Sequence, residues 1–276
     1  MPEPSIDPER GPRSKGLVFG EVAERYDRAR PGYAAELVDD VLSFAGVDEP
    51  DVVEIGAGTG KATVAFAARA TRLLALEPNA AMARIAARRC VGLRNVTIEQ
   101  TTFEEWEPGE CQFDVVVSAQ AWHWVNPDIG YPKAHAVLRP EGVLALLWHR
   151  SVWSDGPLRD AMIALYESLA PGFLETTPTF PGLRMTEADA RRPAEIESSG
   201  VFSGVEVHSH HWQRGYTTAE YLELLGTQSD HVLLDPPTRE VLFDRVARLF
   251  DEDGGRVTVP YVTHLFLARR SRASLD

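Results

Sequence analysis

The stretch with the clearest chemical capability is Glu54-Ile55-Gly56-Ala57-Gly58-Thr59-Gly60-Lys61, where three alternate glycines follow a short β-branched run. Glycine has no Cβ, so this turn lets a ligand come close to the backbone. An alanine-rich amphipathic segment follows at once, and its free N–H groups and dipole would face the same ligand. We therefore predict a bound cofactor at the carboxyl end of a central parallel strand.

The spacing of the turn disfavours two common nucleotide sites. A dinucleotide fingerprint needs glycine at the sixth position, which is Lys61 here, and a phosphate loop needs Ser or Thr after its Gly-Lys. Glu54 ends the strand, where a carboxylate suits a cationic ligand better than a pyrophosphate. Glu77 ends the next apolar run and suits bidentate bonding to a ribose diol. A nucleotide-cofactor oxidoreductase is therefore the least favoured interpretation.

Three motifs in register resemble those of class I S-adenosylmethionine-dependent methyltransferases. The turn resembles their motif I, Leu76-Glu77-Pro78-Asn79 with Met82 the second motif, and the segment from Phe113 to Val125 the fourth-strand motif. The resemblance covers about residues 16–150 and is closest to the small-molecule branch that includes ubiquinone-biosynthesis and trans-aconitate methyltransferases. It implies S-adenosyl-L-methionine as cofactor, S-adenosyl-L-homocysteine as product, and methyl transfer to a small-molecule acceptor by in-line displacement.

The resemblance also implies the cofactor contacts. In the family, a Tyr and Arg-Pro segment covers the cofactor. Tyr26 would therefore pack on the cofactor, and Arg30 would meet its carboxylate. The open alternatives are a core position for Tyr26 and a surface-turn position for Arg30. Thr102 stands where many members carry a carboxylate, and Phe103 would line the adenine slot or belong to the core. The expected contacts are Tyr26, Arg30, Glu54, Gly56, Ala57, Gly58, Gly60, Glu77, Pro78, Met82, Thr102, Phe103, Ser118, Ala119 and Gln120.

The acceptor is expected beside Trp122-His123-Trp124, just after the fourth strand. His123 is the candidate catalytic base, with a structural histidine as the alternative. Trp122 and Trp124 would wall an apolar acceptor pocket or belong to the core. Three polar residues of a later segment are further acceptor contacts or turn and cap residues: Thr227, Ser229 and His231.

No metal site is expected. His208, His210 and His211 fall in a strand pattern that puts His211 on the opposite face, and no partner stands at a metal-ligand spacing. We interpret them as a polar strand face. The two cysteines, Cys90 and Cys111, give no disulfide framework.

These residues need a scaffold in which strands and helices alternate. Apolar runs at 51–55, 72–77, 95–100, 113–118 and 144–149 predict buried parallel strands, and strands at 201–212 and 256–269 would complete a sheet of seven. The fold class is α/β: a doubly wound, mostly parallel, Rossmann-like sheet with helical lid insertions. We expect a flexible tail over 1–14 and one methyltransferase domain over 15–276, with the cofactor-binding core at about 45–150 and lid segments at about 15–44, 151–200 and 214–254.

Composition limits the partners. The formal net charge of −13 disfavours a broad nucleic-acid surface, and no apolar run spans a bilayer or forms a signal-peptide core. We expect a cytoplasmic enzyme with no membrane or nucleic-acid partner and an oligomeric state that the sequence leaves open. The alternative from another class is a non-catalytic S-adenosylmethionine-binding regulatory or scaffold protein.

Overall fold

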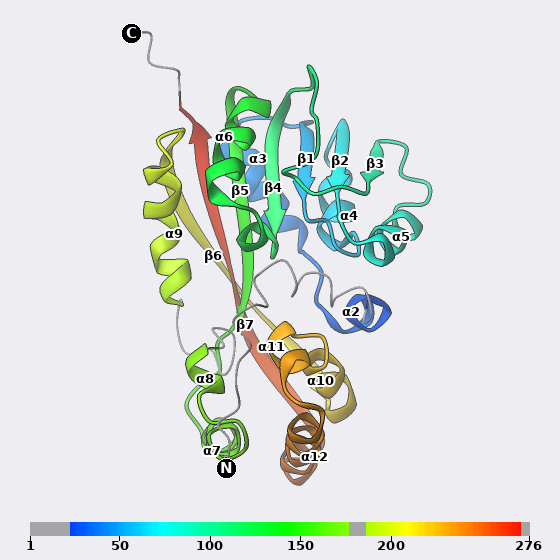
Figure 1. Ribbon diagram of the computed structural model, residues 1–276, viewed down its shortest axis with the longest axis vertical. Coiled ribbons are helices and arrows are strands. Elements are labelled where there is room, and N and C mark those ends of the chain that lie inside the picture. The colour runs from blue at the N-terminus through cyan, green and yellow to red at the C-terminus, as the bar shows by residue number, and fades with distance from the viewer. Residues whose placement is uncertain (1–22, 177–185, 272–276) are drawn as a thin grey trace.

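A seven-stranded sheet runs through the protein, whose computed structural model describes residues 23–176 and 186–271 (Figure 1). The strand order is β3-β2-β1-β4-β5-β7-β6. The strands are β1 (Asp51–Ile55), β2 (Arg72–Leu76), β3 (Val96–Glu99), β4 (Phe113–Ala119), β5 (Leu138–Ser151), β6 (Phe202–Thr217) and β7 (Arg256–Arg270). The predicted tail over 1–14 lies outside the described residues.

The first five strands of the sequence pair in parallel, and β7 lies antiparallel between β5 and β6. All of the parallel strands therefore end at one edge, and the order reverses between β1 and β4, where open α/β sheets bind ligands. This arrangement confirms the predicted doubly wound, mostly parallel sheet of seven strands.

Two layers of helices bury the sheet, because its strands are apolar on both faces. Helices α3 (Ala35–Ala45) and α4 (Lys61–Ala67) pack on one face, and α5 (Ala80–Arg89) lies beside α4. Helices α6 (Pro127–Val137) and α9 (Glu187–Ser198) pack on the other face, around Trp122, Tyr131 and Trp148. The glycine turn at 56–60, which we call the cofactor turn, joins β1 to α4. Its position is therefore fixed by the packed sheet and helices.

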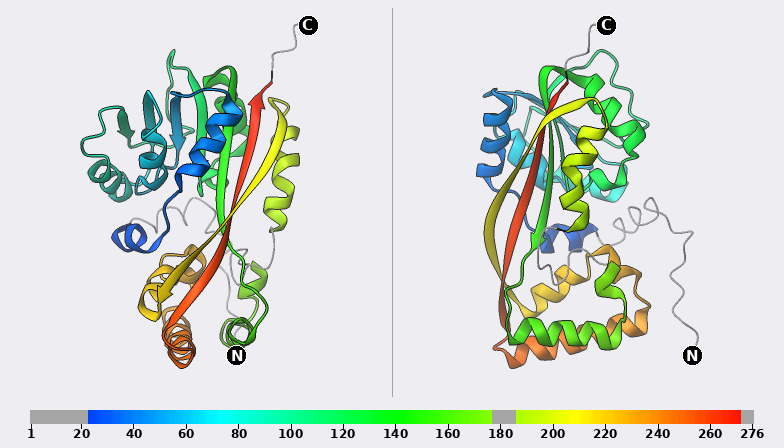
Figure 2. Two further views of the ribbon diagram at one scale, coloured as in Figure 1. Left: turned by 180° about the vertical axis from the view of Figure 1, so that it is seen from behind. Right: turned by 90° about the vertical axis from the view of Figure 1, so that its left-hand side faces the viewer.

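Strands β6 and β7 continue past the carboxyl edge of the sheet and carry a separate group of helices (Figure 1, Figure 2). This helical layer comprises α7 (Pro157–Leu169), α8 (Phe173–Thr176), α10 (Thr218–Leu225), α11 (Ser229–Leu233) and α12 (Pro236–Glu252). Its own apolar core includes Tyr166, Tyr221, Leu242 and Phe250. The layer faces the strand ends, with α2 (Ala23–Ala29) between it and the sheet.

Two helices contain a proline. Prolines such as Pro171, Pro178, Pro181 and Pro193 usually break a helical pattern, and no helix was predicted at 187–198, yet Pro193 lies inside α9. Helix α6, with Pro132 inside it, was not predicted either. Helices tolerate such prolines when tertiary packing compensates for the lost backbone bond, and Ile196 and Tyr131 anchor these two helices in the core. Pro178 and Pro181 lie outside the described residues.

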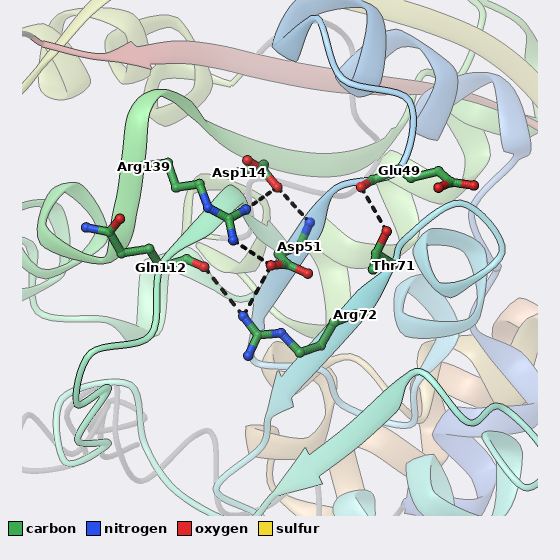
Figure 3. A network of polar contacts seen from close by, with 7 residues as sticks. All are labelled: Glu49, Asp51, Thr71, Arg72, Gln112, Asp114 and Arg139. Atoms are coloured by element: carbon green, nitrogen blue, oxygen red, sulfur yellow. Dashed lines mark hydrogen bonds and ion pairs between the residues drawn. The ribbon is translucent and has the colours of Figure 1, made fainter.

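Charged side chains fasten the amino ends of the strands, at the edge opposite the cofactor turn (Figure 3). Arg139 donates to Asp51 at 2.6 Å and to Asp114 at 2.5 Å, and so links the starts of β5, β1 and β4. Asp114 also accepts the backbone N–H of Asp51 at 2.8 Å. No helix of the described part of the chain is long and apolar enough to cross a membrane.

Candidate cofactor and acceptor site

A pocket opens between the carboxyl edge of the sheet and the helical layer. Its empty space is about 910 Å³ when the opening to solvent is included. Four groups of residues line it: the cofactor turn and β4 end (Glu54, Gly56, Ala57, Gly58, Thr59, Lys61, Ala62, Ala119, Gln120), the N-terminal segment (Tyr26, Arg30, Pro31, Tyr33), the end of β5 (His149, Arg150, Ser151), and the helical layer with β7 (Tyr221, Leu224, Gln228, Val259, Tyr261).

The glycines of the turn are required for two different reasons. All three have positive φ: 72° at Gly56, 58° at Gly58 and 81° at Gly60. A Cβ at Gly56 would lie 2.3 Å from the Ala121 Cβ, and one at Gly60 would lie 3.1 Å from the Ala86 Cα. At Gly58 the nearest atom would be the Met82 sulfur, 4.0 Å away. Close packing therefore requires glycine at 56 and 60, whereas Gly58 keeps space open at the pocket.

Glu77 supports the turn from the neighbouring strand. Its Oε2 accepts the Gly58 N–H and its Oε1 accepts the Asn79 N–H, both at 2.8 Å. Burial raises the pKa of this carboxyl, although the two backbone donors oppose the shift. Each carboxylate oxygen has a second lone pair, so Glu77 can still accept from a ligand hydroxyl.

Glu54 is a buried carboxylate with capacity for one more partner. Its Oε2 accepts from the Thr63 hydroxyl at 2.6 Å, and its Oε1 has no partner among the described residues. Burial raises the pKa of Glu54 to about 7. A cation at this point would satisfy the free oxygen and favour the charged carboxylate.

The N-terminal segment Ala23–Tyr33, which we call the strap, crosses the pocket and touches both of its sides. Arg30 donates through Nε to the Thr227 hydroxyl at 2.9 Å and through a terminal nitrogen to the Thr227 carbonyl at 3.1 Å. Its guanidinium also lies 5.2 Å from the centre of the Tyr26 ring. The strap thus joins the helical layer to the cofactor turn.

His149, at the end of β5, fastens the strap to the sheet. The Gly32 carbonyl, 3.2 Å away, can only accept, so Nε2 carries the proton. Nδ1 then accepts from the Thr263 hydroxyl at 2.7 Å. Burial lowers the pKa of His149 to about 4, so the ring is neutral at physiological pH. Tyr33 stacks on this ring at 4.6 Å, and His149 is therefore a positioning group with both nitrogens engaged.

Arg150, next to His149, is held by a buried carboxylate of α9. Its Nε and a terminal nitrogen donate to the two oxygens of Asp189 at 2.6 and 2.8 Å. Burial alone would raise the pKa of Asp189, but the hydrogen bond and charge of Arg150 outweigh it and the pKa is lowered. The pair presents little net charge to the pocket.

Eight of the expected cofactor contacts line this pocket: Tyr26, Arg30, Glu54, Gly56, Ala57, Gly58, Ala119 and Gln120. The other seven are outside its lining. Glu77, Pro78 and Met82 lie behind the turn at the β2–α5 junction, and Gly60 packs on α5. The Ser118 hydroxyl donates to the Ile55 carbonyl and ties β4 to β1. Thr102 caps the turn before Trp106, and the Phe103 ring lies in the core against Trp106 and Trp122.

The expected acceptor residues after β4 form a 3-10 turn, Trp122–Trp124, outside the pocket lining. Trp122 is buried in the core against Tyr131. His123 is exposed, and its Nδ1 accepts from the Trp148 indole N–H at 3.4 Å. Trp124 is half-buried, with its ring 4.6 Å from His123.

The expected residues of the helical layer have different positions. Thr227 is fully buried and binds Arg30 of the strap. Ser229 begins α11. His231 is buried in the core of the layer, where its Nε2 pairs with the Tyr166 hydroxyl at 2.8 Å and burial lowers its pKa to about 3.

Sequence reasoning missed most of the wall opposite the turn: Tyr33, His149, Arg150, Tyr221, Gln228 and Tyr261. His149 had a usable signal, since it ends a predicted strand at the edge where ligands bind. Arg150 follows it on β5. The other four come from the strap, α10, its C-terminal loop and β7, and only the tertiary fold brings them to the pocket.

Two of the three histidines of β6 are paired with carboxylates. His208 and His210 both contact Asp40 of α3, at 2.9 and 2.8 Å, and His208 also contacts Glu206 at 3.1 Å. The hydrogen bond to Asp40 raises the pKa of His208. The described residues contain no group of three or more His, Cys, Asp or Glu that could hold a metal ion.

Comparisons with known proteins agree with this geometry. Residues 52–142 match the model of a methyltransferase domain family. An uncharacterized methyltransferase of Mycobacterium tuberculosis is 28% identical over 259 residues, which cover 91% of this chain and 95% of that protein.

Two solved structures share the fold. A protein described as a type II methyltransferase, from Anaeromyxobacter dehalogenans, has a TM-score of 0.62 at 20% identity and covers 87% of this chain and 97% of its own. An S-adenosylmethionine-dependent methyltransferase from Thiobacillus denitrificans, in complex with S-adenosylhomocysteine, has a TM-score of 0.52 at 11% identity, with 92% and 98% covered.

Proposed function

Because the chain belongs to the class I S-adenosylmethionine-dependent methyltransferases, we propose that it transfers a methyl group to a small-molecule acceptor. Its cofactor is S-adenosyl-L-methionine and its product S-adenosyl-L-homocysteine. The observation that carries the proposal is the pocket itself, which lies between the cofactor turn and the helical layer. Residues of the strap and of the helical layer line the pocket opposite the turn, which favours a compact acceptor over a macromolecular one.

The residues of the pocket fit this cofactor. The space kept open by Gly58 lets a ligand approach the turn, and the unpaired Oε1 of Glu54 suits a cationic group. We propose that Glu77 holds the ribose hydroxyls, that Arg30 meets the carboxylate, and that backbone carbonyls of Ser118, Ala119 and Gln120 receive the amine. When bound, the cofactor supplies a methyl group on a positively charged sulfur.

The chain's own contribution is alignment and exclusion of water. Methyl transfer requires the acceptor lone pair to point at the methyl carbon, so fixed walls on both sides lower the entropic cost of reaction. We propose that the strap and the helical layer act as the lid, since they supply most of the wall opposite the turn. They account for only part of the expected lid segments 15–44, 151–200 and 214–254, because α3 and α9 within those segments pack on the sheet. His123, the base expected from the sequence, lies outside the pocket lining with its Nδ1 bonded to Trp148, so we propose that it supports the site and does not take a proton from the acceptor. Thr102, Phe103, Pro78, Met82 and Gly60 are proposed as supports of the cofactor site.

The remaining properties support a small-molecule enzyme. A formal net charge of −13 opposes a nucleic-acid partner. Cys90 and Cys111 are free thiols, which agrees with the proposed reducing, cytoplasmic compartment.

Transfer of a labelled methyl group tests the proposal. The protein and methyl-labelled S-adenosylmethionine are present in each of three incubations. The first contains a small-molecule metabolite extract, the second proteins above 10 kDa (about the size cut of a common filter), and the third total RNA. We expect label in the small-molecule fraction only. Label in RNA or protein alone would contradict the small-molecule acceptor and leave the methyltransferase class intact.

A further inference from the structure

The pocket has two walls of different chemistry. The cofactor turn supplies one wall, with its backbone N–H groups and Glu54. The other, which we call the helical wall, comprises Tyr221, Leu224, Gln228, Val259 and Tyr261. Because the cofactor belongs on the turn, the acceptor must approach its methyl group from the helical wall.

Packing holds the aromatic rings of the helical wall in place. Tyr261 stacks on Trp212 at 4.3 Å with only 9° between the ring planes, and its hydroxyl pairs with that of Tyr216 at 3.0 Å. Tyr221 packs on Phe250 with ring centres 4.8 Å apart. Leu224 and Val259 complete an apolar surface that suits a flat, apolar molecule.

Gln228 provides one polar group on this wall that lacks a partner. Its side-chain Oε1 is buried, and the described residues offer it no hydrogen bond. Its backbone is fixed, since its N–H donates to the Leu225 carbonyl and its carbonyl accepts from Val232, both at 3.0 Å. A buried amide oxygen without a donor is costly, so a ligand that supplies a donor gains from it.

Charge on the wall argues against an ionic acceptor. None of its five residues is charged. The nearby Arg150 is neutralised by Asp189 through two hydrogen bonds, and Arg30 points its Nε and a terminal nitrogen at Thr227. The third cation of the lining, Lys61, lies 4.0 Å from the Asp27 carboxylate. A carboxylate on the helical wall would therefore lose its hydration and meet no cation of that wall.

We propose that the acceptor is an uncharged aromatic compound carrying a hydroxyl or N–H group, and that this group donates to Gln228 Oε1. The inference rests on the proposed function, because it assigns the helical wall to a small-molecule acceptor. Gln228 is then a specificity-determining residue, since sites built to bond a hydroxyl or N–H discriminate against analogues that lack it.

Binding of matched bicyclic probes tests this directly. The full chain is saturated with S-adenosylhomocysteine and titrated with 2-naphthol, 2-methylnaphthalene, 2-methoxynaphthalene and 2-naphthoate, with tryptophan fluorescence or calorimetry as readout. We expect 2-naphthol to bind about tenfold or more tightly than the two neutral analogues, which lack a donor. We expect 2-naphthoate to bind most weakly.

Two variants locate the effect at one atom. Gln228→Leu should abolish the preference for 2-naphthol and leave 2-methylnaphthalene at least as tightly bound. Gln213→Leu, at an exposed position of β6, is the matched control and should keep the preference. Both variants should bind S-adenosylhomocysteine as the unchanged protein does, which shows that they fold.

Several results would overturn the inference. These are no binding by any neutral probe, tighter binding of 2-methoxynaphthalene or 2-naphthoate than of 2-naphthol, or a preference that survives Gln228→Leu. Failure of S-adenosylhomocysteine itself to bind would instead refute the proposed function, so the two failures are distinguishable.

Discussion

Glu77 has two tasks at the cofactor turn, and one substitution tests both. Its carboxylate holds the Gly58 N–H and is the proposed ribose partner. Glu77→Ala should weaken S-adenosylhomocysteine binding by about 1.5–3 kcal/mol, the value of hydrogen bonds to a charged group. Calorimetry measures this change. Glu99→Ala, at an exposed position on the neighbouring strand β3, should bind normally, and equal affinity of both variants would place the ribose elsewhere.

Glu54 should make cofactor binding depend on pH. Its pKa of about 7 lies above the ordinary value of 4.5, so below pH 7 the free protein holds a proton there. A bound cation favours the carboxylate, so binding expels that proton and affinity falls as the pH drops below 7. Calorimetry of S-adenosylmethionine binding at pH 6.5, in two buffers of different ionisation enthalpy, should detect proton release.

The substitution Glu54→Gln should remove this proton release, because an amide does not titrate. Glu36→Gln, at an exposed position of α3, should retain it. Proton release that persists in Glu54→Gln would assign it to another group.

His123 is the base expected from its place in the sequence, yet its position outside the pocket lining and its bond to Trp148 favour a small effect. Its Nδ1 accepts from Trp148, so the neutral ring carries its proton on Nε2 and has no free lone pair while that bond lasts. Loss of a positioned base typically costs about 10²–10⁴ in rate. We expect His123→Ala to lower turnover by less than about tenfold. A loss of 10²-fold or more at unchanged cofactor affinity would establish His123 as the base.

At the scale of elements, Arg139 joins three strands far from the pocket (Figure 3). Arg139→Met should lower the free energy of unfolding by about 1 kcal/mol, a value kept small because the side chain is 38% exposed and its ion pairs are partly screened by water. Asp51 and Asp114 would lose their shared donor. Denaturant titration measures the loss, with Arg94→Met in an exposed loop as control. Weakened cofactor binding would contradict a purely structural role.

Several elements were predictable from local pattern, and others were not. Strand β1 begins and ends as predicted at 51–55, because a glycine turn marks its end. Helices α5 and α10 carry equally local signals, an Asn79 cap and a Thr217–Glu220 capping box. Helix α9 was missed because its proline obscured a short apolar face that only packing against the sheet stabilises. Similarly, β6 and β7 pair over a length that no local signal reveals.

At the scale of the whole molecule, the strap connects the two sides of the pocket through Arg30 and Thr227. Thr227→Val removes the acceptor of the Arg30 Nε while keeping the side-chain shape. We expect S-adenosylhomocysteine affinity to fall by roughly tenfold, about 1.4 kcal/mol, and amide exchange to accelerate over 23–33. Thr258→Val, at an exposed position of β7, should change neither quantity. Unchanged exchange in Thr227→Val would show that Arg30 does not hold the strap.

The glycine turn that lines one side of the pocket was predictable from sequence, although seven of the fifteen expected cofactor contacts lie outside the lining, and the opposite wall was not predictable. The turn residues are adjacent in the chain, so spacing alone defines their chemistry. Tyr33, Gln228 and Tyr261 are far apart in the chain, and none belongs to a motif. Their convergence depends on the extension of β6 and β7 beyond the sheet, which is a tertiary property.

That extension also separates the residues proposed for the cofactor from those proposed for the acceptor. The proposed cofactor residues come from the ends of β1, β2 and β4 and from the strap, whereas the helical wall is carried on the far end of a two-stranded ribbon and its helices. Substitutions on the ribbon and its helices can therefore alter the acceptor without disturbing the sulfonium chemistry. Such an enzyme can change its substrate over evolutionary time, or in the laboratory, through substitutions at one end of two strands.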